Sequence, residues 1–219
     1  EYMRWIAAVL DSHIQTHLNP EKLRITHLGG GACSLARYCA DVYPNSRNTV
    51  VELDAKLAEY VRDWFDIPKS PRVKIRVGDA GTVTRSFAPA SRDVVIRDVF
   101  AVDKTPAELT GVDFVRTVDN SLAPGGLYIL NCGDDRALNA ARAEATALLE
   151  VFEYVSIVAD SAMLKGRRRG NIILAGSHAP LPQLGSAEAA SISRVLMGGG
   201  VPAQYWDTEK VRVFARKGA

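Results

Sequence analysis

Hydrophobic and polar positions follow a regular pattern along the chain, and the period of the pattern changes from one segment to the next. In residues 2–18 apolar side chains recur at helical spacing, which predicts an amphipathic N-terminal helix that ends before Pro20. Residues 23–28 form a short apolar run that is typical of a buried strand. Residues 34–42 return to a helical pattern, which ends before Pro44. The chain therefore begins as helix, strand and helix.

The same alternation continues through the centre of the chain. Four further strands are predicted, each short and rich in branched apolar residues, at 49–53, 73–77, 93–97 and 127–131. Helical patterns are found in the segments between and after these strands, at 55–64, from Ala80 over a short stretch, at 111–122 and at 136–150. Strands that alternate with helices indicate a mostly parallel sheet with helices on both faces and right-handed crossovers.

The last third of the chain departs from this alternation. Segments 152–158 and 171–175 have strand patterns on either side of a basic turn, so we expect them to pair antiparallel. Residues 179–219 are rich in proline and glycine and predict a tail with two short helices. The expected organisation is an N-terminal helix in residues 1–22, a seven-stranded α/β domain in 23–178, and the tail packed on that domain.

Composition narrows the classes of protein that remain. The chain has 219 residues, of which 47% are hydrophobic and 24% charged, with a formal charge of +2. These values are typical of a globular protein and do not predict a nucleic-acid partner or a membrane span, which needs an apolar run of ~20 residues. Cys33, Cys39 and Cys132 lack disulfide or zinc-site spacing, which favours a cytoplasmic location. His13 and His17 have no third ligand in view, so no metal site is predicted.

The candidate chemistry lies where the predicted strands end, because ligands of such sheets bind beyond the carboxyl ends of the strands. The first strand ends in Gly29, Gly30 and Gly31, which would let backbone N–H groups and a helix N-terminus approach a ligand. A glycine turn alone is equally typical of a tight turn. The second strand ends in Glu52, 21 residues after Gly31, close to the spacing at which an acid accepts hydrogen bonds from ribose hydroxyls.

Two more carboxylates follow at the next strand ends. Asp79 could accept a hydrogen bond from the exocyclic amine of a base, and Asp98 would point into the same crevice. No His, Ser or Cys nucleophile accompanies them, which suggests a cationic substrate. The glycines lack the lysine of a P-loop, and Ser34 interrupts the dinucleotide pattern GxGxxG. An S-adenosyl ligand, which carries a sulfonium and no pyrophosphate, fits these acids better.

Six motifs carry a resemblance to a known family. The segments HLGGGACSLARY, VVELD, VGDAGT, VVIRDVF, LAPGGLYILN and GRRRGNIILA, within residues 22–176, resemble the spermidine synthase-like aminopropyltransferases. The resemblance implies the Rossmann-like fold of S-adenosylmethionine-dependent methyltransferases. It implies that the residues lining the decarboxylated S-adenosylmethionine site are Gly29, Gly30, Gly31, Glu52, Asp79 and Ala80. It also implies that Asp98 is the catalytic residue, which would contact the amine as well.

The implied reaction moves an aminopropyl group to a polyamine such as putrescine, in a homodimer that holds no tightly bound cofactor. Two positions depart from the family pattern, since Ala32 and Ala101 stand where the family usually has Asp. Asp103 is a nearby candidate for the amine-binding role. Two alternatives therefore stay open, a methyltransferase that uses S-adenosylmethionine and a non-catalytic relative that binds an adenosyl ligand.

Overall fold

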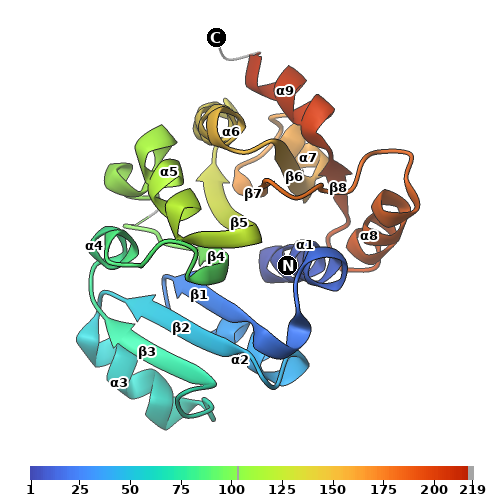
Figure 1. The fold of residues 1–219 in the computed structure, drawn as a ribbon. Coiled ribbons are helices and arrows are strands. Elements are labelled where there is room, and N and C mark those ends of the chain that lie inside the picture. The colour runs from blue at the N-terminus through green and yellow to red at the C-terminus, as the bar shows by residue number, and fades with distance from the viewer. Residues whose placement is uncertain (103, 217–219) are drawn as a thin grey trace.

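A single mixed sheet, covered by helices on both faces, forms the centre of the protein (Figure 1). The computed structural model describes residues 1–102 and 104–216. Among them the sheet has eight strands in the order β3-β2-β1-β4-β5-β7-β6-β8. Its parallel half consists of β1 (Arg24–Leu28), β2 (Arg47–Glu52), β3 (Val73–Val77), β4 (Arg92–Arg97) and β5 (Leu122–Asp134).

The other half of the sheet is antiparallel. Strand β7 (Gly170–Ser177) lies between β5 and β6 (Tyr154–Asp160) and runs against both, which confirms the predicted antiparallel pair. Strand β8 (Ala203–Trp206) pairs with β6 at the edge, so the prediction of seven strands was wrong by one. Only two of its four residues, Ala203 and Tyr205, are buried. A strand this short carries too little alternation to be recognised beside the glycine run that precedes it.

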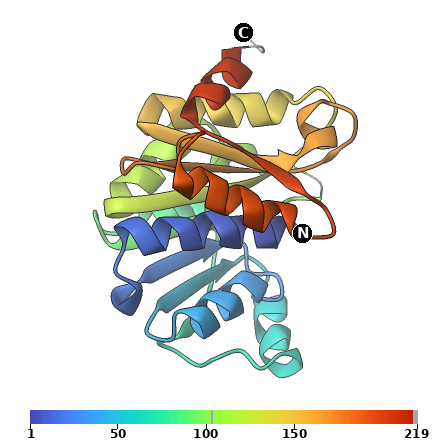
Figure 2. The same cartoon turned by 90° about the vertical axis from the view of Figure 1, so that its right-hand side faces the viewer.

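Alternate residues of each strand face two separate layers of helices. On β4, Val94 and Ile96 pack in one apolar cluster and Val95 packs in another. The helices on the first face are α1 (Tyr2–His17), α2 (Ser34–Val42), α3 (Ala55–Trp64) and α8 (Ala187–Met197). The second face is covered by α4 (Ala80–Arg85), α5 (Gly111–Ser121), α6 (Asn139–Val151) and α9 (Thr208–Arg216). Figure 2 shows α1 and α8 side by side over the sheet.

The connections contain three short helical segments, η1 (Pro20–Lys22), η2 (Ala107–Leu109) and α7 (Ser161–Leu164). The predicted N-terminal helix is present and ends at His17, one residue earlier than expected. Within residues 1–102 and 104–216, every helix is too short or too polar to cross a bilayer.

Helix α1 is fixed by polar as well as apolar contacts. Asp11 accepts hydrogen bonds from the hydroxyls of Tyr38 at 2.5 Å and Tyr43 at 2.8 Å, which lie on α2 and at its C-terminal end. Charge-assisted bonds of this kind are stronger than neutral ones. Helix α2 begins just after the glycine turn. The contacts of Asp11 therefore hold the N-terminal helix close to the part of the sheet where the candidate site residues lie.

Candidate active site

The glycine turn after β1 is pressed against the neighbouring strand ends. Gly29 has a φ of +90°, and a Cβ added there would lie 2.1 Å from the carbonyl oxygen of Asp98. At Gly30 a Cβ would lie 3.0 Å from Glu52 Oε2. Position 29 therefore requires glycine for its backbone conformation and its contact, whereas a side chain at position 30 would force Glu52 or Val50 to shift slightly. The absence of side chains brings the ends of β1, β2 and β4 together.

The carboxylate of Glu52 binds the backbone of this turn. Its Oε2 accepts hydrogen bonds from the N–H groups of Gly30 at 3.0 Å and Gly31 at 3.1 Å, and its Oε1 accepts one from Asp54 at 2.9 Å. An ionised carboxylate has about four acceptor positions, so a ligand hydroxyl could still donate to it. The bonds to the turn fix the orientation in which Glu52 would meet such a ligand.

Asp79 caps the N-terminus of α4. Its Oδ1 accepts a hydrogen bond from the N–H of Thr82 at 2.7 Å, and that bond holds the pKa of the Asp79 carboxyl below its usual range. The side chain is exposed, and the next residue, Ala80, is buried under it. Asp79 is therefore an ionised acceptor on the rim of the site.

Asp98 is held by a hydrogen bond on each carboxylate oxygen. Tyr2 donates its hydroxyl to Oδ2 at 3.0 Å, and Asn131 donates its Nδ2 to Oδ1 at 2.9 Å. Burial, together with the negative charge of Asp98, raises the pKa of Tyr2 well above its usual value, so the phenol stays protonated and keeps donating. Neither Tyr2 nor Asn131 was predicted from the sequence. The position of Asn131 could have indicated a site residue, because it is a polar residue at the end of an apolar strand.

The predicted site residues meet in one cleft of about 610 Å³, which we call the glycine-turn cleft. Its lining includes all of the predicted residues that the structure describes, namely Gly29, Gly30, Gly31, Glu52, Asp79, Ala80 and Asp98. Ala32 and Ala101 line it too. Asp103 lies outside the described residues. The geometry thus brings these residues together, while the role of each one stays a prediction.

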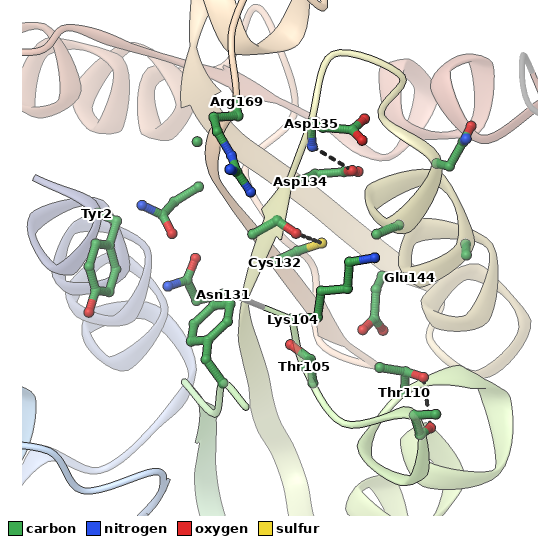
Figure 3. A pocket seen from close by; sticks show the side chains of 18 of the residues that line it. Tyr2, Lys104, Thr105, Thr110, Asn131, Cys132, Asp134, Asp135, Glu144 and Arg169 are labelled. Atoms are coloured by element: carbon green, nitrogen blue, oxygen red, sulfur yellow. Dashed lines mark hydrogen bonds between the residues drawn. The ribbon is translucent and has the colours of Figure 1, made fainter. Parts of the chain in front are cut away.

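A second cavity of about 870 Å³, which we call the α6 cavity, adjoins this cleft. The two share Tyr2 and Phe100, and Asn131 of the α6 cavity binds Asp98 of the cleft. Figure 3 shows the side chains of Asn131, Lys104 and Arg169 around this cavity. Asp98 therefore stands at the junction of two ligand-sized spaces.

Two residues that line the α6 cavity each carry a buried acceptor atom without a hydrogen-bond partner among the described residues. These atoms are Oδ1 of Asn131 and Oε2 of Glu144. The other oxygen of Glu144 accepts a hydrogen bond from Arg97, whose guanidinium is fully buried, at 2.6 Å. Buried acceptors without partners are costly, and a ligand could satisfy these two atoms only after a rotation of the side chains, because neither atom is exposed to the cavity.

The donor set in the described ranges does not suggest a metal. Within residues 1–102 and 104–216, no three His, Cys, Asp or Glu side chains are grouped so that they could share an ion. Chemically, the arrangement offers a glycine-lined cradle with acids for a nucleoside, a fixed carboxylate in its lining, and a neighbouring space lined by polar side chains. Such a site can hold an adenosyl ligand in the cleft and an amine in the α6 cavity.

No family model matches the sequence. A probable spermidine synthase from Corynebacterium glutamicum, known from its crystal structure, has 60% sequence identity with the chain and a TM-score of 0.95. The alignment covers 98% of this chain and 77% of that one. The chain belongs to the spermidine synthase-like family. This confirms the resemblance inferred from the six motifs.

The fold of the chain is also similar to that of human methyltransferase-like protein 13, whose structure is known in complex with SAH. That protein is 25% identical to the chain with a TM-score of 0.67, and the alignment covers 87% of this chain and 89% of that one. The protein therefore has the predicted Rossmann-like methyltransferase fold with a mostly parallel sheet.

Two groups of curated relatives match about half of the chain. The eEF1A lysine and N-terminal methyltransferase of Mus musculus is 33% identical over 128 residues, which is 53% of this chain and 18% of the relative. The polyamine aminopropyltransferase of Vibrio vulnificus is 26% identical over 114 residues, which is 51% of this chain and 38% of the relative. The chain thus matches only a minor part of the length of either relative, and both transfer chemistries occur among the relatives of this spermidine synthase-like protein.

Proposed function

We propose that the protein transfers an aminopropyl group from decarboxylated S-adenosylmethionine to an amine of a polyamine such as putrescine. The observation that carries the proposal is the position of Asp98. Its carboxylate is held by Tyr2 and Asn131 at the junction of the glycine-turn cleft and the α6 cavity. One space would hold the donor and the other the acceptor.

The cleft suits the adenosyl part of the donor. Gly29, Gly30 and Gly31 leave room for it, Glu52 would accept hydrogen bonds from the ribose hydroxyls, and Asp79 beside Ala80 would contact the adenine. The acids around this cleft would repel a phosphate, so they favour a ligand without one. In the α6 cavity, Asn131 and Glu144 would accept N–H groups of the amine after a rotation that turns their unpartnered oxygens toward it.

The fixed carboxylate fits the chemistry of the transfer. Amines with a pKa near ~10 are mostly protonated at neutral pH, so the nucleophile must lose a proton before it reacts. In the proposed step Asp98 accepts that proton, and the nitrogen lone pair attacks the carbon bonded to the sulfonium. The C–N bond forms as the C–S bond breaks, and the bond electrons neutralise the sulfur of methylthioadenosine. Alignment of the two reactants can supply several of the ~7–11 kcal/mol attributed to effective molarity.

Release of methylthioadenosine tests the proposal. The protein is incubated with decarboxylated S-adenosylmethionine and putrescine, and the product is followed by chromatography. We expect release that depends on the amine and falls to background in Asp98→Asn, which keeps the size of the side chain and removes its basicity. A wild-type rate equal to that of Asp98→Asn would overturn the proposal.

A specific observation favours a second function, methyl transfer from S-adenosylmethionine. Ala32 lies in the glycine-turn cleft where the family usually has an Asp, and a methionyl carboxylate is better tolerated where that acid is missing. One group of relatives is named as methyltransferases. Calorimetry that compares S-adenosylhomocysteine with methylthioadenosine separates the two functions, since a preference for the former favours methyl transfer. Binding of either ligand without turnover over a panel of amines would favour a non-catalytic relative.

The assembly and location of the protein are part of the same proposal. We expect a homodimer, which light scattering after gel filtration would test, and no nucleic-acid partner. Cys33, Cys39 and Cys132 are all buried free thiols, which supports a reducing compartment such as the cytoplasm. Titration of the intact protein with a thiol reagent before and after unfolding would test whether the thiols are free and protected.

A further inference from the structure

A third cavity, of about 510 Å³, lies between α6, α9, β8 and the turn after α7, and we call it the basic cavity. It shares no lining residue with the glycine-turn cleft or the α6 cavity. Four of its eleven lining residues are basic, and none is acidic. The basic residues are Arg136, Arg142, Lys165 and Lys210. A concentration of one charge in a concave site raises the local concentration of ions of the opposite charge.

In residues 1–102 and 104–216, the four basic side chains of this cavity lie without an acidic partner. The side chains of Arg136, Lys165 and Lys210 also donate no hydrogen bond to a described residue, and all three are exposed. Like charges that share a cavity repel one another, weakly where solvent screens them, and an anion bound between them would replace repulsion by attraction. Their grouping therefore points to an anionic ligand.

The backbone that carries these side chains is well fixed. Gly166 has a φ of +64°, and a Cβ added there would lie 2.5 Å from the carbonyl oxygen of Arg136. The turn that carries Lys165 is thus packed directly on the loop that carries Arg136. Arg142 donates Nη1 to the carbonyl of Ala137 at 2.7 Å and lies 5.4 Å from the centre of the Phe214 ring. Its Nε is buried and has no partner in the described part of the chain.

The wall of the cavity is aromatic. Trp206 is half-buried and meets Phe214 edge to face at 5.7 Å, so the indole is held in place by packing. A volume of about 510 Å³ lies within the ~300–1,000 Å³ that is usual for small-molecule sites and far exceeds the needs of a single phosphate. A fixed aromatic side chain beside several cations suits a ligand with a planar ring and more than one negative charge.

We propose that the basic cavity binds a nucleoside polyphosphate, with the phosphates on Arg136, Lys165 and Lys210 and the base against Trp206. The site is separate from the adenosyl ligand of the proposed reaction. The end of β5 and the loop after it connect the basic cavity to the α6 cavity. Asp134 and Asp135 line the α6 cavity, and Arg136 lines the basic cavity. A ligand bound in the basic cavity would therefore stabilise a loop that also lines the α6 cavity.

Calorimetric titration with ATP and GTP tests the proposal. Both nucleotides should bind, and Lys165→Ala/Lys210→Ala should weaken binding at least tenfold. The matched control is Lys69→Ala/Lys74→Ala, which removes two exposed lysines near β3 and should leave binding unchanged. Glu52→Gln, which alters the glycine-turn cleft, should also leave it unchanged. Circular dichroism of each variant checks that the fold is intact.

Trp206 gives a second, local readout. Nucleotide binding should change the emission of the wild-type protein and leave that of Trp206→Phe nearly unchanged. Absence of ATP and GTP binding would overturn the proposal, as would binding that survives Lys165→Ala/Lys210→Ala and disappears in Glu52→Gln. Tripolyphosphate that binds as tightly as ATP would show that no base is recognised and would overturn the assignment to a nucleotide. None of these measurements depends on aminopropyl transfer, so failure of the proposed reaction leaves the result interpretable.

Discussion

The hydroxyl of Tyr2 donates a hydrogen bond to Oδ2 of Asp98 at 3.0 Å, across 96 positions of the chain. The contact joins the first turn of the N-terminal helix to the end of β4. Apolar packing of α1 on the sheet and the bonds of Asp11 to two tyrosines from the α2 region together hold the helix in the position that this contact needs. The candidate catalytic carboxylate is thus oriented by a part of the chain that lies outside the α/β repeat.

Tyr2→Phe should therefore lower activity with little effect on the fold. A hydrogen bond to a charged group contributes about 1.5–3 kcal/mol, so we expect kcat for methylthioadenosine release to fall roughly 10- to 100-fold. The KM for the donor should change less than kcat, because the proposed ribose and adenine contacts are made by Glu52 and Asp79 and not by the Tyr2 hydroxyl. Tyr60→Phe, a change of the same kind on the exposed side of α3, is the control. Equal kcat values in Tyr2→Phe and the wild type would contradict an orienting role for Tyr2.

The strand-end residues could be predicted from the sequence because their positions follow from topology. In a parallel sheet the carboxyl ends of neighbouring strands meet, so Gly29, Glu52, Asp79 and Asp98 were expected to share a crevice, and they line one cleft. Tyr2 could not be found in this way. Helical periodicity identifies the apolar face of a helix, and it does not reveal which distant strand end a polar residue at the first turn will reach.

The α6 cavity could not be predicted from the sequence for a related reason. Glu144 lies in an alanine-rich segment whose pattern predicts a helix and nothing more, and its burial depends on Arg97. The sequence did hold a signal, since a charged residue inside the apolar run of β4 requires a buried partner of opposite charge. Which acid is the partner depends on how α6 packs on the sheet, and the sequence pattern does not reveal this tertiary contact. Strand β8 was missed because four residues are too few for a pattern.

Gly29→Ala should disrupt both the fold and the site. The added methyl carbon would lie 2.1 Å from the carbonyl oxygen of Asp98, and alanine is strained at a φ of +90°. We expect a loss of several kcal/mol in the free energy of unfolding, measured with urea, since both strain and a backbone displacement contribute. Gly31→Ala is the matched control, because its φ of +46° is milder and no atom lies within 4 Å of the added carbon. Similar losses in the two variants would show that the contact with Asp98 is unimportant.

The Arg97–Glu144 pair should behave as a buried ion pair. Arg97→Met would leave the Glu144 carboxylate buried without its cation, and breaking such a pair typically costs about 3–5 kcal/mol. Arg97→Met/Glu144→Leu should recover most of the loss, because neither charge remains. Arg116→Met, from an exposed pair with Asp113 at 3.7 Å, should cost less than about 1 kcal/mol. Urea unfolding of the four proteins measures this, and a double variant no more stable than Arg97→Met would contradict the assignment.

Acid should destabilise the protein through its buried histidines. His27, in β1, donates Nε2 to Oδ1 of Asn48 at 3.0 Å, and its Nδ1 is buried without a partner. Burial lowers the pKa of His27 to about 4, and burial also lowers the pKa of His13 to about 4. Since the unfolded chain has a histidine pKa of about 6.5, it takes up protons first as the pH falls. Stability should therefore decrease between about pH 6.5 and pH 4, where the folded protein resists protonation.

His27→Gln separates this effect from the general titration of carboxylates. Glutamine can still donate to Asn48, and the variant loses one of the two buried imidazoles. Each proton taken up on unfolding steepens the pH dependence of the free energy of unfolding by up to about 1.4 kcal/mol per pH unit. The variant should therefore lose less stability than the wild type between pH 7 and pH 4.5, with His178→Gln on the surface as the control. If the stability difference between His27→Gln and the wild type stays constant over this range, His27 is not the group that resists protonation in the fold.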